Sequence, residues 1–304
     1  MTVTRLTVSL AAQEPARLPY YKGSVIRGGF GLAFRRVVCP FPKRECSDCL
    51  LRQRCVWSYV FATPRPEDST IMRKYETIPH PFVIEPPEED KTSYAPGDEL
   101  VFTLVLIGKA IESVPYFIYA FEQMAEQGLG SGRARFKVAA VRQGEAPFYD
   151  STAGTIATPV STQTLDLAPT AETATSATFS FTTPTHIVYQ GRVARRPAFH
   201  VVFRSLLRRL GLLAYFHDQP VEINYQGLIK QAEAVKTDSI TTGTTQWRRF
   251  STRQNRAIRM DGIMGKATYT GDLKRFLPYL RAGEVLHVGK STAFGMGKYQ
   301  LEVE

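Results

Sequence analysis

Four cysteines lie close together in the first quarter of the chain and form its densest set of potential metal ligands. Cys39, Cys46, Cys49 and Cys55 follow the spacing C-x6-C-x2-C-x5-C. Four thiolates with a central C-x2-C pair can complete a tetrahedral site, which suits a structural Zn²⁺ ion. An iron–sulfur cluster uses the same ligands and is the alternative. We favour Zn²⁺, because nothing else in the sequence suggests a redox function.

A glycine-rich segment at residues 287–299 is the second feature with chemical potential. Glycines free the backbone for left-handed conformations, and exposed N–H groups in such loops can bind phosphate. A second glycine-rich segment, residues 128–135, contains Arg133 and Arg135. Two such loops favour an RNA backbone over a mononucleotide as ligand, and the alternative is a hairpin that only turns the chain. The candidate RNA-binding residues of the first segment are Gly289, Lys290, Ser291, Thr292, Gly295, Gly297 and Lys298.

Side chains suited to acid–base chemistry are scattered rather than grouped in one motif. The chain has five histidines, and histidine titrates near neutral pH. His287 is the first catalytic candidate because it leads into the glycine-rich segment, and the alternative is a buried structural histidine. His217 ends a predicted helix, where histidine commonly interacts with the helix dipole. Tyr21 and Lys22 could act in place of histidine, and the other three histidines offer no comparable motif.

Basic residues are in excess and unevenly placed. Lys and Arg total 38 against 28 Asp and Glu, and the resulting net charge of +10 is typical of proteins that bind a polyanion. Arg195 and Arg196 lie in a segment almost free of carboxylates. Arg248, Arg249 and Arg253 lie among aromatic residues, a combination that suits phosphates and unstacked bases. We expect both groups to contact nucleic acid, and the alternative is a solvated cationic face.

Hydrophobic patterning predicts the elements that position these residues. Alternation predicts strands near residues 3–10, 82–84, 100–106 and 136–140, and helical periodicity predicts helices near 26–37 and 114–125. This order of elements is that of a ferredoxin-like domain. The second half repeats it with a strand near 179–181, helices near 199–213, 228–235 and 273–280, strands near 247–250 and 257–269, and a last strand at 285–288.

The sequence thus predicts an α+β protein with two tandem ferredoxin-like βαββαβ domains, glycine-rich loops and a four-cysteine insertion. We place the domains at residues 1–146, with the cysteine loop at 39–55, and at 177–304, with 147–176 as a linker or edge segment. The 304 residues, 43% of them hydrophobic, suffice for two cores. No apolar run reaches the roughly 20 residues that span a bilayer. The start of the chain lacks signal-peptide features, so we expect a cytoplasmic protein without a membrane partner.

Short sequence stretches in both halves of the chain resemble those of a known protein family. In the second half they are Trp247–Gln254, Gly262–Gly265, Gly271–Leu273, Phe276–Pro278 and Gly283–Tyr299; in the first half they are Tyr21–Ser24, Arg27–Gly31, the four cysteines, Pro79–Val83 and Gly128–Phe136. With these stretches the chain resembles the CRISPR-associated repeat-RNA endoribonucleases of the RAMP superfamily, which process precursor crRNA. The resemblance covers nearly the whole chain and is weakest over 143–176. It implies two ferredoxin-like domains with a glycine-rich RNA-contacting loop, and metal-independent cleavage of repeat RNA. We also expect Arg27 to be among the RNA-binding residues.

Cleavage of this kind needs no catalytic metal. The substrate's own 2′-hydroxyl attacks the phosphate and leaves a 2′,3′-cyclic phosphate, and the protein is expected to retain the product. Many members of the family are similar in carrying a catalytic histidine near the first helix, whereas no histidine precedes His80 here. The alternative is therefore a non-catalytic crRNA-binding subunit of a CRISPR effector complex, with other effector subunits as partners.

Overall fold

Two compact units make up the computed structural model of the chain. The N-terminal unit comprises Thr2–Thr164 and Phe216–Gln219, and the C-terminal unit comprises Met1, Leu165–Tyr215 and Pro220–Glu304. The structure describes residues 1–41, 44–66, 69, 77–245, 248–251 and 256–304, and for 248–251 and 256–259 it describes the backbone alone.

The N-terminal unit is built on an antiparallel sheet with the strand order β3-β5-β1-β6. Along the chain, the strands and helices of this unit alternate as in a ferredoxin-like domain. They are β1 (Thr2–Ala12), α1 (Gly23–Val38), β3 (Phe82–Glu85), β5 (Glu99–Ile107), α3 (Val114–Gln127) and β6 (Phe136–Gln143). Additions to this plan are β2 (Ala16–Arg17), η1 (Cys46–Asp48), α2 (Val56–Phe61), β4 (Ser93–Tyr94), η2 (Gly108–Ser113), β7 (Ala146–Asp150), β8 (Thr155–Ile156) and β9 (Gln163–Thr164).

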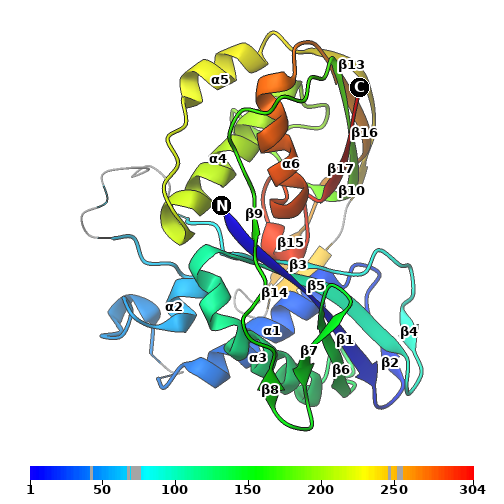
Figure 1. Ribbon diagram of the computed structural model, residues 1–304. Coiled ribbons are helices and arrows are strands. Elements are labelled where there is room, and N and C mark those ends of the chain that lie inside the picture. The colour runs from blue at the N-terminus through cyan, green and yellow to red at the C-terminus, as the bar shows by residue number, and fades with distance from the viewer. Residues whose placement is uncertain (42–43, 67–68, 70–76, 246–247, 252–255) are drawn as a thin grey trace. The chain divides into compact units, whose positions relative to one another are not determined.

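Phenylalanines pack the two main helices of this unit, α1 and α3, against its sheet. Figure 1 shows the ribbon of these elements. The Phe30 ring of α1 is fully buried and lies 5.1 Å from the ring of Phe117 and 4.9 Å from that of Phe121, both in α3. It also lies 5.7 Å from the ring of Phe82 in β3. The alternation in the first half of β5 follows from the same packing, because its inward side chains, such as Phe102, contact α3 at Phe121. The second half, Leu104–Ile107, is buried at every position.

The C-terminal unit repeats the plan with the strand order β13-β16-β10-β17. Its six principal elements are β10 (Ser176–Thr185), α4 (Phe199–His217), β13 (Lys236–Thr245), β16 (Gly262–Thr270), α6 (Leu277–Leu286) and β17 (Tyr299–Val303). Shorter elements are β11 (Val188–Tyr189), β12 (Arg192–Val193), α5 (Tyr225–Ala232), β14 (Arg248–Ser251), β15 (Arg256–Arg259), η3 (Lys274–Phe276) and η4 (Thr292–Phe294). The last two residues of α4 are grouped with the N-terminal unit.

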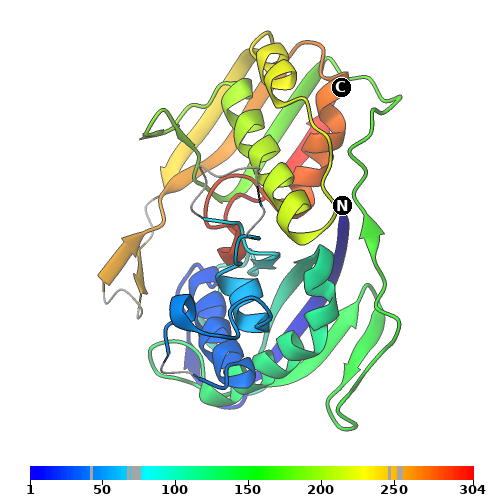
Figure 2. The ribbon, with the colours of Figure 1, turned by 90° about the vertical axis from the view of Figure 1, so that its left-hand side faces the viewer.

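Aromatic side chains also fix the helices of this unit. Figure 2 shows α4 and α6 together over one face of the C-terminal sheet. The Phe203 ring of α4 lies 4.8 Å from that of Phe276 and 5.8 Å from that of Tyr279 in α6. On the sheet, the buried Tyr269 hydroxyl donates a hydrogen bond to the Pro197 carbonyl at 2.8 Å, and the Tyr299 hydroxyl donates to the Leu280 carbonyl at 2.6 Å. Buried tyrosines thus have their polar ends satisfied.

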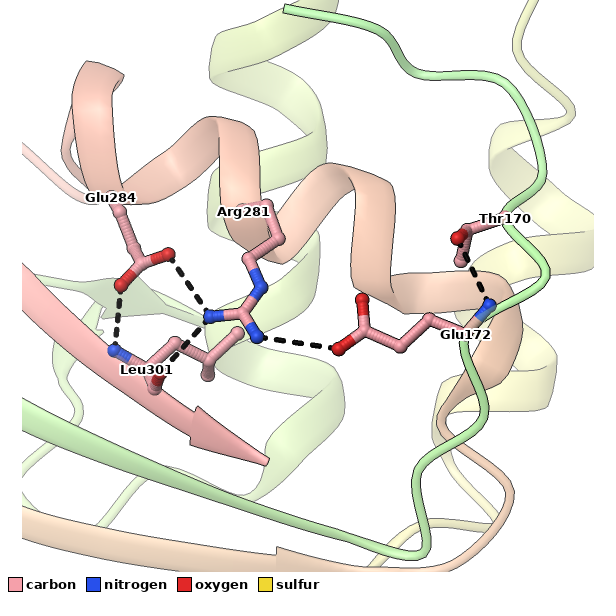
Figure 3. Close-up of polar contacts among 5 residues, drawn as sticks. All are labelled: Thr170, Glu172, Arg281, Glu284 and Leu301. Atoms are coloured by element: carbon pink, nitrogen blue, oxygen red, sulfur yellow. Dashed lines mark hydrogen bonds and ion pairs between the residues drawn. The ribbon is translucent and has the colours of Figure 1, made fainter. Parts of the chain in front are cut away.

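A polar network fastens the segment before β10 to the C-terminal unit (Figure 3). Arg281 of α6 contacts Glu172 at 3.3 Å and donates to the Leu301 carbonyl at 3.1 Å. Glu284 accepts from the Leu301 N–H at 2.8 Å, which links α6 to β17. The region around Glu172 is therefore attached to this unit.

The fold class predicted from the sequence is confirmed, and one local prediction is wrong. Val285 and Leu286 complete α6 instead of forming the expected last strand at 285–288, and the last strand is β17. The units divide between Thr164 and Leu165, inside the segment 147–176 expected to be a linker or edge, and β7 to β9 extend the N-terminal sheet there. Within the described residues, no helix combines the length and the apolar character needed to cross a membrane.

Candidate functional site

His287 lies inside the glycine-rich loop rather than at its surface. It caps the end of α6 with a left-handed φ of 63° and is fully buried. Its N–H donates to the Gly283 carbonyl at 2.8 Å. Its Nδ1 donates to the Met296 carbonyl at 3.1 Å, because a carbonyl oxygen can only accept. This burial favours the structural interpretation of His287, and its catalytic role stays a prediction.

Backbone hydrogen bonds, within the loop and to β10, also hold the rest of the glycine-rich loop. Val288 N–H donates to the Gly297 carbonyl at 2.9 Å, and Gly297 N–H donates to the Pro184 carbonyl at 3.0 Å. Gly297 has a φ of 80°, and a Cβ at this position would lie 1.9 Å from the Val288 carbonyl oxygen. Backbone N–H groups that serve these bonds are not available to a phosphate. The loop is therefore a fixed structure with a small outer surface.

The most exposed part of this loop is the stretch 289–291. Lys290 and Ser291 are exposed, and Gly289 is partly exposed. Thr292, Gly295 and Gly297, which the sequence also suggested as RNA-binding, are buried, and Lys298 is half-buried with its N–H bonded to the Thr183 hydroxyl at 2.9 Å. Contact with a ligand would thus be made mainly by the Lys290 and Ser291 side chains.

His186 lies directly beside this exposed stretch. Its carbonyl accepts a hydrogen bond from the Lys290 N–H at 2.9 Å, and a Cβ on Gly289 would lie 2.6 Å from that carbonyl oxygen. The ring Nδ1 donates to the Asp261 carbonyl at 2.8 Å, which leaves Nε2 as the acceptor. Unlike His287, the residue is partly exposed. The sequence did not single out His186, because no motif around it indicates that it lies beside the distant Lys290.

Arg209 is a buried cation next to the same loop. Only 6% of this residue is exposed, and its Nε donates to the Leu286 carbonyl at 2.8 Å, at the end of α6. No carboxylate among the described residues pairs with it. Burial lowers the pKa of Arg209 to about 9. A guanidinium in this position caps a helix end and places positive charge beneath the loop.

His217 is held by two groups of the N-terminal unit. Its Nε2 donates to the Pro79 carbonyl at 2.8 Å, and the Tyr59 hydroxyl lies 3.3 Å from Nδ1 and acts as the donor there. The residue is fully buried. Burial, assisted by the charge of Glu112, raises the pKa of Tyr59 well above its usual value, so this hydroxyl keeps its proton. The arrangement satisfies a neutral imidazole and leaves it little opportunity to reach a substrate.

Tyr21 and Lys22 lie at the start of α1, as expected, but differ in access. Lys22 is fully buried, and its Nζ donates to the Glu89 carbonyl at 2.7 Å. Burial is the main cause that lowers the pKa of Lys22. Tyr21 is partly exposed, and burial of its hydroxyl raises its pKa well above the usual value. Arg27, farther along α1, lies over the ring of Phe61 with 4.4 Å between its Cζ and the centroid.

The other basic candidates are surface residues or lie outside the described side chains. Arg133 is exposed in the second glycine-rich segment, with a φ of 49°. Arg135 is exposed beside it and contacts Glu14 at 3.5 Å. Arg195 and Arg196 are exposed before α4. Arg248 and Arg249 belong to β14, with side chains outside the described set, and Arg253 lies outside the described residues.

The four cysteines come together around one small cavity. Cys39, Cys46, Cys49 and Cys55 all line it, and its volume is about 10 Å³. All four are free thiols and partly exposed. Among the described residues, no three His, Cys, Asp or Glu side chains are already arranged to hold a metal ion. The predicted metal therefore stays a prediction.

Comparison with known proteins bears on both halves of the chain. Residues 179–299 match the family model of the CRISPR-associated endoribonuclease Cas6, and residues 1–161 match the family AF_1859_N, described as an N-terminal domain. A relative, an uncharacterized protein from Archaeoglobus fulgidus, is 25% identical over 131 residues. The match covers 43% of this chain and 43% of that relative, so the chain spans less than half of the relative's length.

Solved structures share the fold over the full length. A Cas6 product complex superposes with a TM-score of 0.60 at 17% identity and covers 99% of each chain. Thermus thermophilus Cas6 gives a TM-score of 0.56 at 16% identity, over 99% of this chain and 98% of its own. A partial Cas6-RT-Cas1–Cas2 complex gives 0.57 at 13% identity, over 100% of this chain and 46% of the other.

Proposed function

We propose that the chain is a Cas6-type endoribonuclease that cuts precursor CRISPR RNA within its repeats. The observation that carries this proposal is the family match over residues 179–299, which contains the whole glycine-rich loop. The net charge of +10 and the exposed Arg195, Arg196 and Lys290 support an RNA ligand.

The proposed reaction is an internal transesterification. The 2′-oxygen forms a bond to phosphorus, the bond from phosphorus to the 5′-oxygen breaks, and the products are a 2′,3′-cyclic phosphate and a 5′-hydroxyl. The 2′-hydroxyl proton goes to a general base, and the 5′-oxygen receives a proton from a general acid. Positive side chains stabilise the charge on the phosphorane. No divalent metal takes part in these steps.

His186 is the described group best placed for acid–base work in the C-terminal unit. The Asp261 carbonyl fixes its tautomer with Nε2 as the acceptor nitrogen, and the residue is partly exposed. Lys290, whose main chain is bonded to His186, supplies positive charge beside it. The candidates from the sequence, Tyr21, Lys22, His217 and His287, stay in the proposal as groups to be tested, and Tyr21 alone among them is partly exposed.

The test is single-turnover cleavage of a precursor transcript that carries the repeats of the protein's own CRISPR array. We expect cleavage in excess EDTA, a 2′,3′-cyclic phosphate on the upstream fragment, and no cut when the scissile nucleotide is 2′-deoxy. Cleavage of the deoxy substrate, or its loss in EDTA, would overturn this mechanism. Co-purification of the cut fragment with the protein checks the proposed retention of product.

The second candidate is a non-catalytic crRNA-binding subunit of an effector complex. The burial of Lys22, His217 and His287 supports it, since three of the four catalytic candidates from the sequence have no exposed surface. Tight binding of the repeat without any cleavage, by protein that is folded and RNA-free at the start, would select it. Other CRISPR-associated subunits would then be the partners to seek, as in the Cas6-RT-Cas1–Cas2 assembly that shares the fold.

A further inference from the structure

None of the described residues in the segment between α1 and α2 is buried. Cys39 follows the last residue of α1, Cys46 begins η1, Cys49 follows its last residue, and Cys55 caps the start of α2. No residue of η1 is buried, and Leu50 is 77% exposed. A chain segment of this length without buried apolar side chains gains little free energy from packing and usually needs a cross-link. The four thiols are the groups at hand to supply one.

The four thiols line one cavity, although no three of them are yet arranged to hold a metal ion in the described part of the chain. The cavity that all four line has a volume of about 10 Å³, which is about the space of one water-sized sphere. Short backbone hydrogen-bonded turns hold two of the cysteines: Cys49 N–H donates to the Cys46 carbonyl at 3.4 Å, and Arg52 N–H donates to the Cys49 carbonyl at 2.9 Å. We propose that the four thiolates turn into this cavity and bind one structural Zn²⁺ ion.

The charges around the cavity fit such a centre. Zn²⁺ with four thiolates carries a net charge of about −2 and is stabilised by nearby cations. Arg44 and Arg52 line the cavity with the cysteines, and no carboxylate among the described residues pairs with either. The lining contains no Asp or Glu, so thiolate is its only anionic ligand type, which suits Zn²⁺ rather than Ca²⁺ or Mg²⁺.

The ion would attach this segment to the core of the N-terminal unit. Trp57, another lining residue, stacks on Phe61 with 4.1 Å between ring centroids and lies 6.4 Å from the Phe34 ring of α1. The metal would therefore tie the loop to α1 and α2 at once. This inference does not rest on the proposed endoribonuclease activity, because it concerns only the folding of residues 39–55.

The first test is metal content of the full-length protein, expressed with zinc and iron both supplied. We expect about one zinc per chain by plasma mass spectrometry, and a loss of at least roughly tenfold in Cys46→Ser/Cys49→Ser. Ser47→Ala, an exposed change in the same turn, is the matched control and should keep the metal. Iron with visible absorbance in place of zinc would overturn the zinc assignment, and equal zinc in the double variant would overturn the site.

A second measurement uses the unaltered protein, so that a misfolded variant cannot decide the matter. Titration with an organomercurial should release zinc in step with the reaction of the thiols, as a zinc indicator reports. Replacement of zinc by Co²⁺ should give the intense visible bands of a tetrahedral thiolate site. Four thiols that react at once in native protein, with no zinc released, would overturn the proposal.

Discussion

His186 and His287 are both fixed through Nδ1 by a backbone carbonyl, yet only one of them can meet a substrate. The carbonyl of Asp261 holds His186, and the carbonyl of Met296 holds His287. Both rings are therefore set in one tautomer. His186 is partly exposed, whereas His287 is fully enclosed. The two histidines near the glycine-rich loop should respond differently to substitution.

His186→Ala should lower the single-turnover rate of repeat cleavage by on the order of 10²–10⁴, because a general acid–base group is lost. The affinity for RNA should change little, since the phosphate contacts are expected to come from Lys and Arg side chains. His200→Ala is the matched control, because His200 is also partly exposed in the same unit but lies on α4 beside Tyr189. Equal rates for the two variants would remove His186 from the reaction.

His287→Ala should act on stability instead. It removes a buried ring with a hydrogen bond to Met296, which we expect to lower the free energy of unfolding by on the order of 1–3 kcal/mol. Urea denaturation measures this, and cleavage at a temperature well below the transition should be nearly normal. A folded variant of normal stability that binds repeat RNA but no longer cuts it would instead show that His287 is catalytic.

Arg209→Met tests whether the buried guanidinium is present for stability. The charge has one hydrogen bond, to Leu286, and no carboxylate partner among the described residues, so its burial is costly. Methionine keeps most of the volume, and we expect the variant to be as stable as the wild type or more so. RNA affinity should fall, because a positive charge beneath the loop is lost. A drop in the denaturation midpoint with unchanged RNA affinity would show that Arg209 acts only as a helix cap.

At the scale of elements, the glycine-rich loop depends on a backbone conformation that residues other than glycine rarely adopt. Gly297→Ala should lower the free energy of unfolding by more than about 2 kcal/mol, since it adds a strained φ and a clash with the Val288 carbonyl. Gly132→Ala is the matched control, because a Cβ there would meet nothing within 4 Å. Chemical denaturation of both variants measures the difference, and equal stabilities would mean that the loop relaxes at little cost.

The sequence predicted the elements whose apolar side chains face a core on a regular period. The alternation from Leu100 to Leu106 became β5, and the periodic helix from Phe199 to Leu213 became α4. In both cases the apolar residues recur at the period of the element, although burial extends beyond one face: β5 is buried throughout Leu104–Ile107, and α4 is exposed only at Arg204. The order of these elements was then enough for the ferredoxin-like plan of both units.

The elements that the sequence did not predict lack a regular pattern of apolar residues. β13 is polar, with Thr, Ser and Asp on a strand at the edge of its sheet, and most of its residues are exposed. Val285 to Val288 look like a strand because the buried end of α6 runs into the buried start of the loop. His186 was missed because its neighbour Lys290 is far away in sequence. Such contacts depend on strand pairing, which a local pattern does not encode.

For the whole molecule, the excess positive charge should govern binding of RNA. The affinity for repeat RNA should fall steeply with salt, as counterions are released from the phosphates. Arg195→Ala/Arg196→Ala should weaken binding and reduce the slope of log K against log salt by about 1–2. The control is Arg275→Ala, whose guanidinium already lies 3.7 Å from Asp272. Equal slopes for the two variants would place Arg195 and Arg196 outside the interface.

The division of the chain between the two units has a consequence for its synthesis. The N-terminal unit is not continuous in sequence, because it includes Phe216–Gln219, where His217 bonds to Pro79 and Tyr59. A ribosome that has finished Thr164 must therefore add roughly 50 more residues, which takes on the order of 3–10 s, before this unit can close. During that interval the strands of the N-terminal unit have been made, but His217, which bonds to Pro79 and Tyr59 in this unit, has not. The half that is made first cannot finish folding until much of α4 has followed it out of the ribosome.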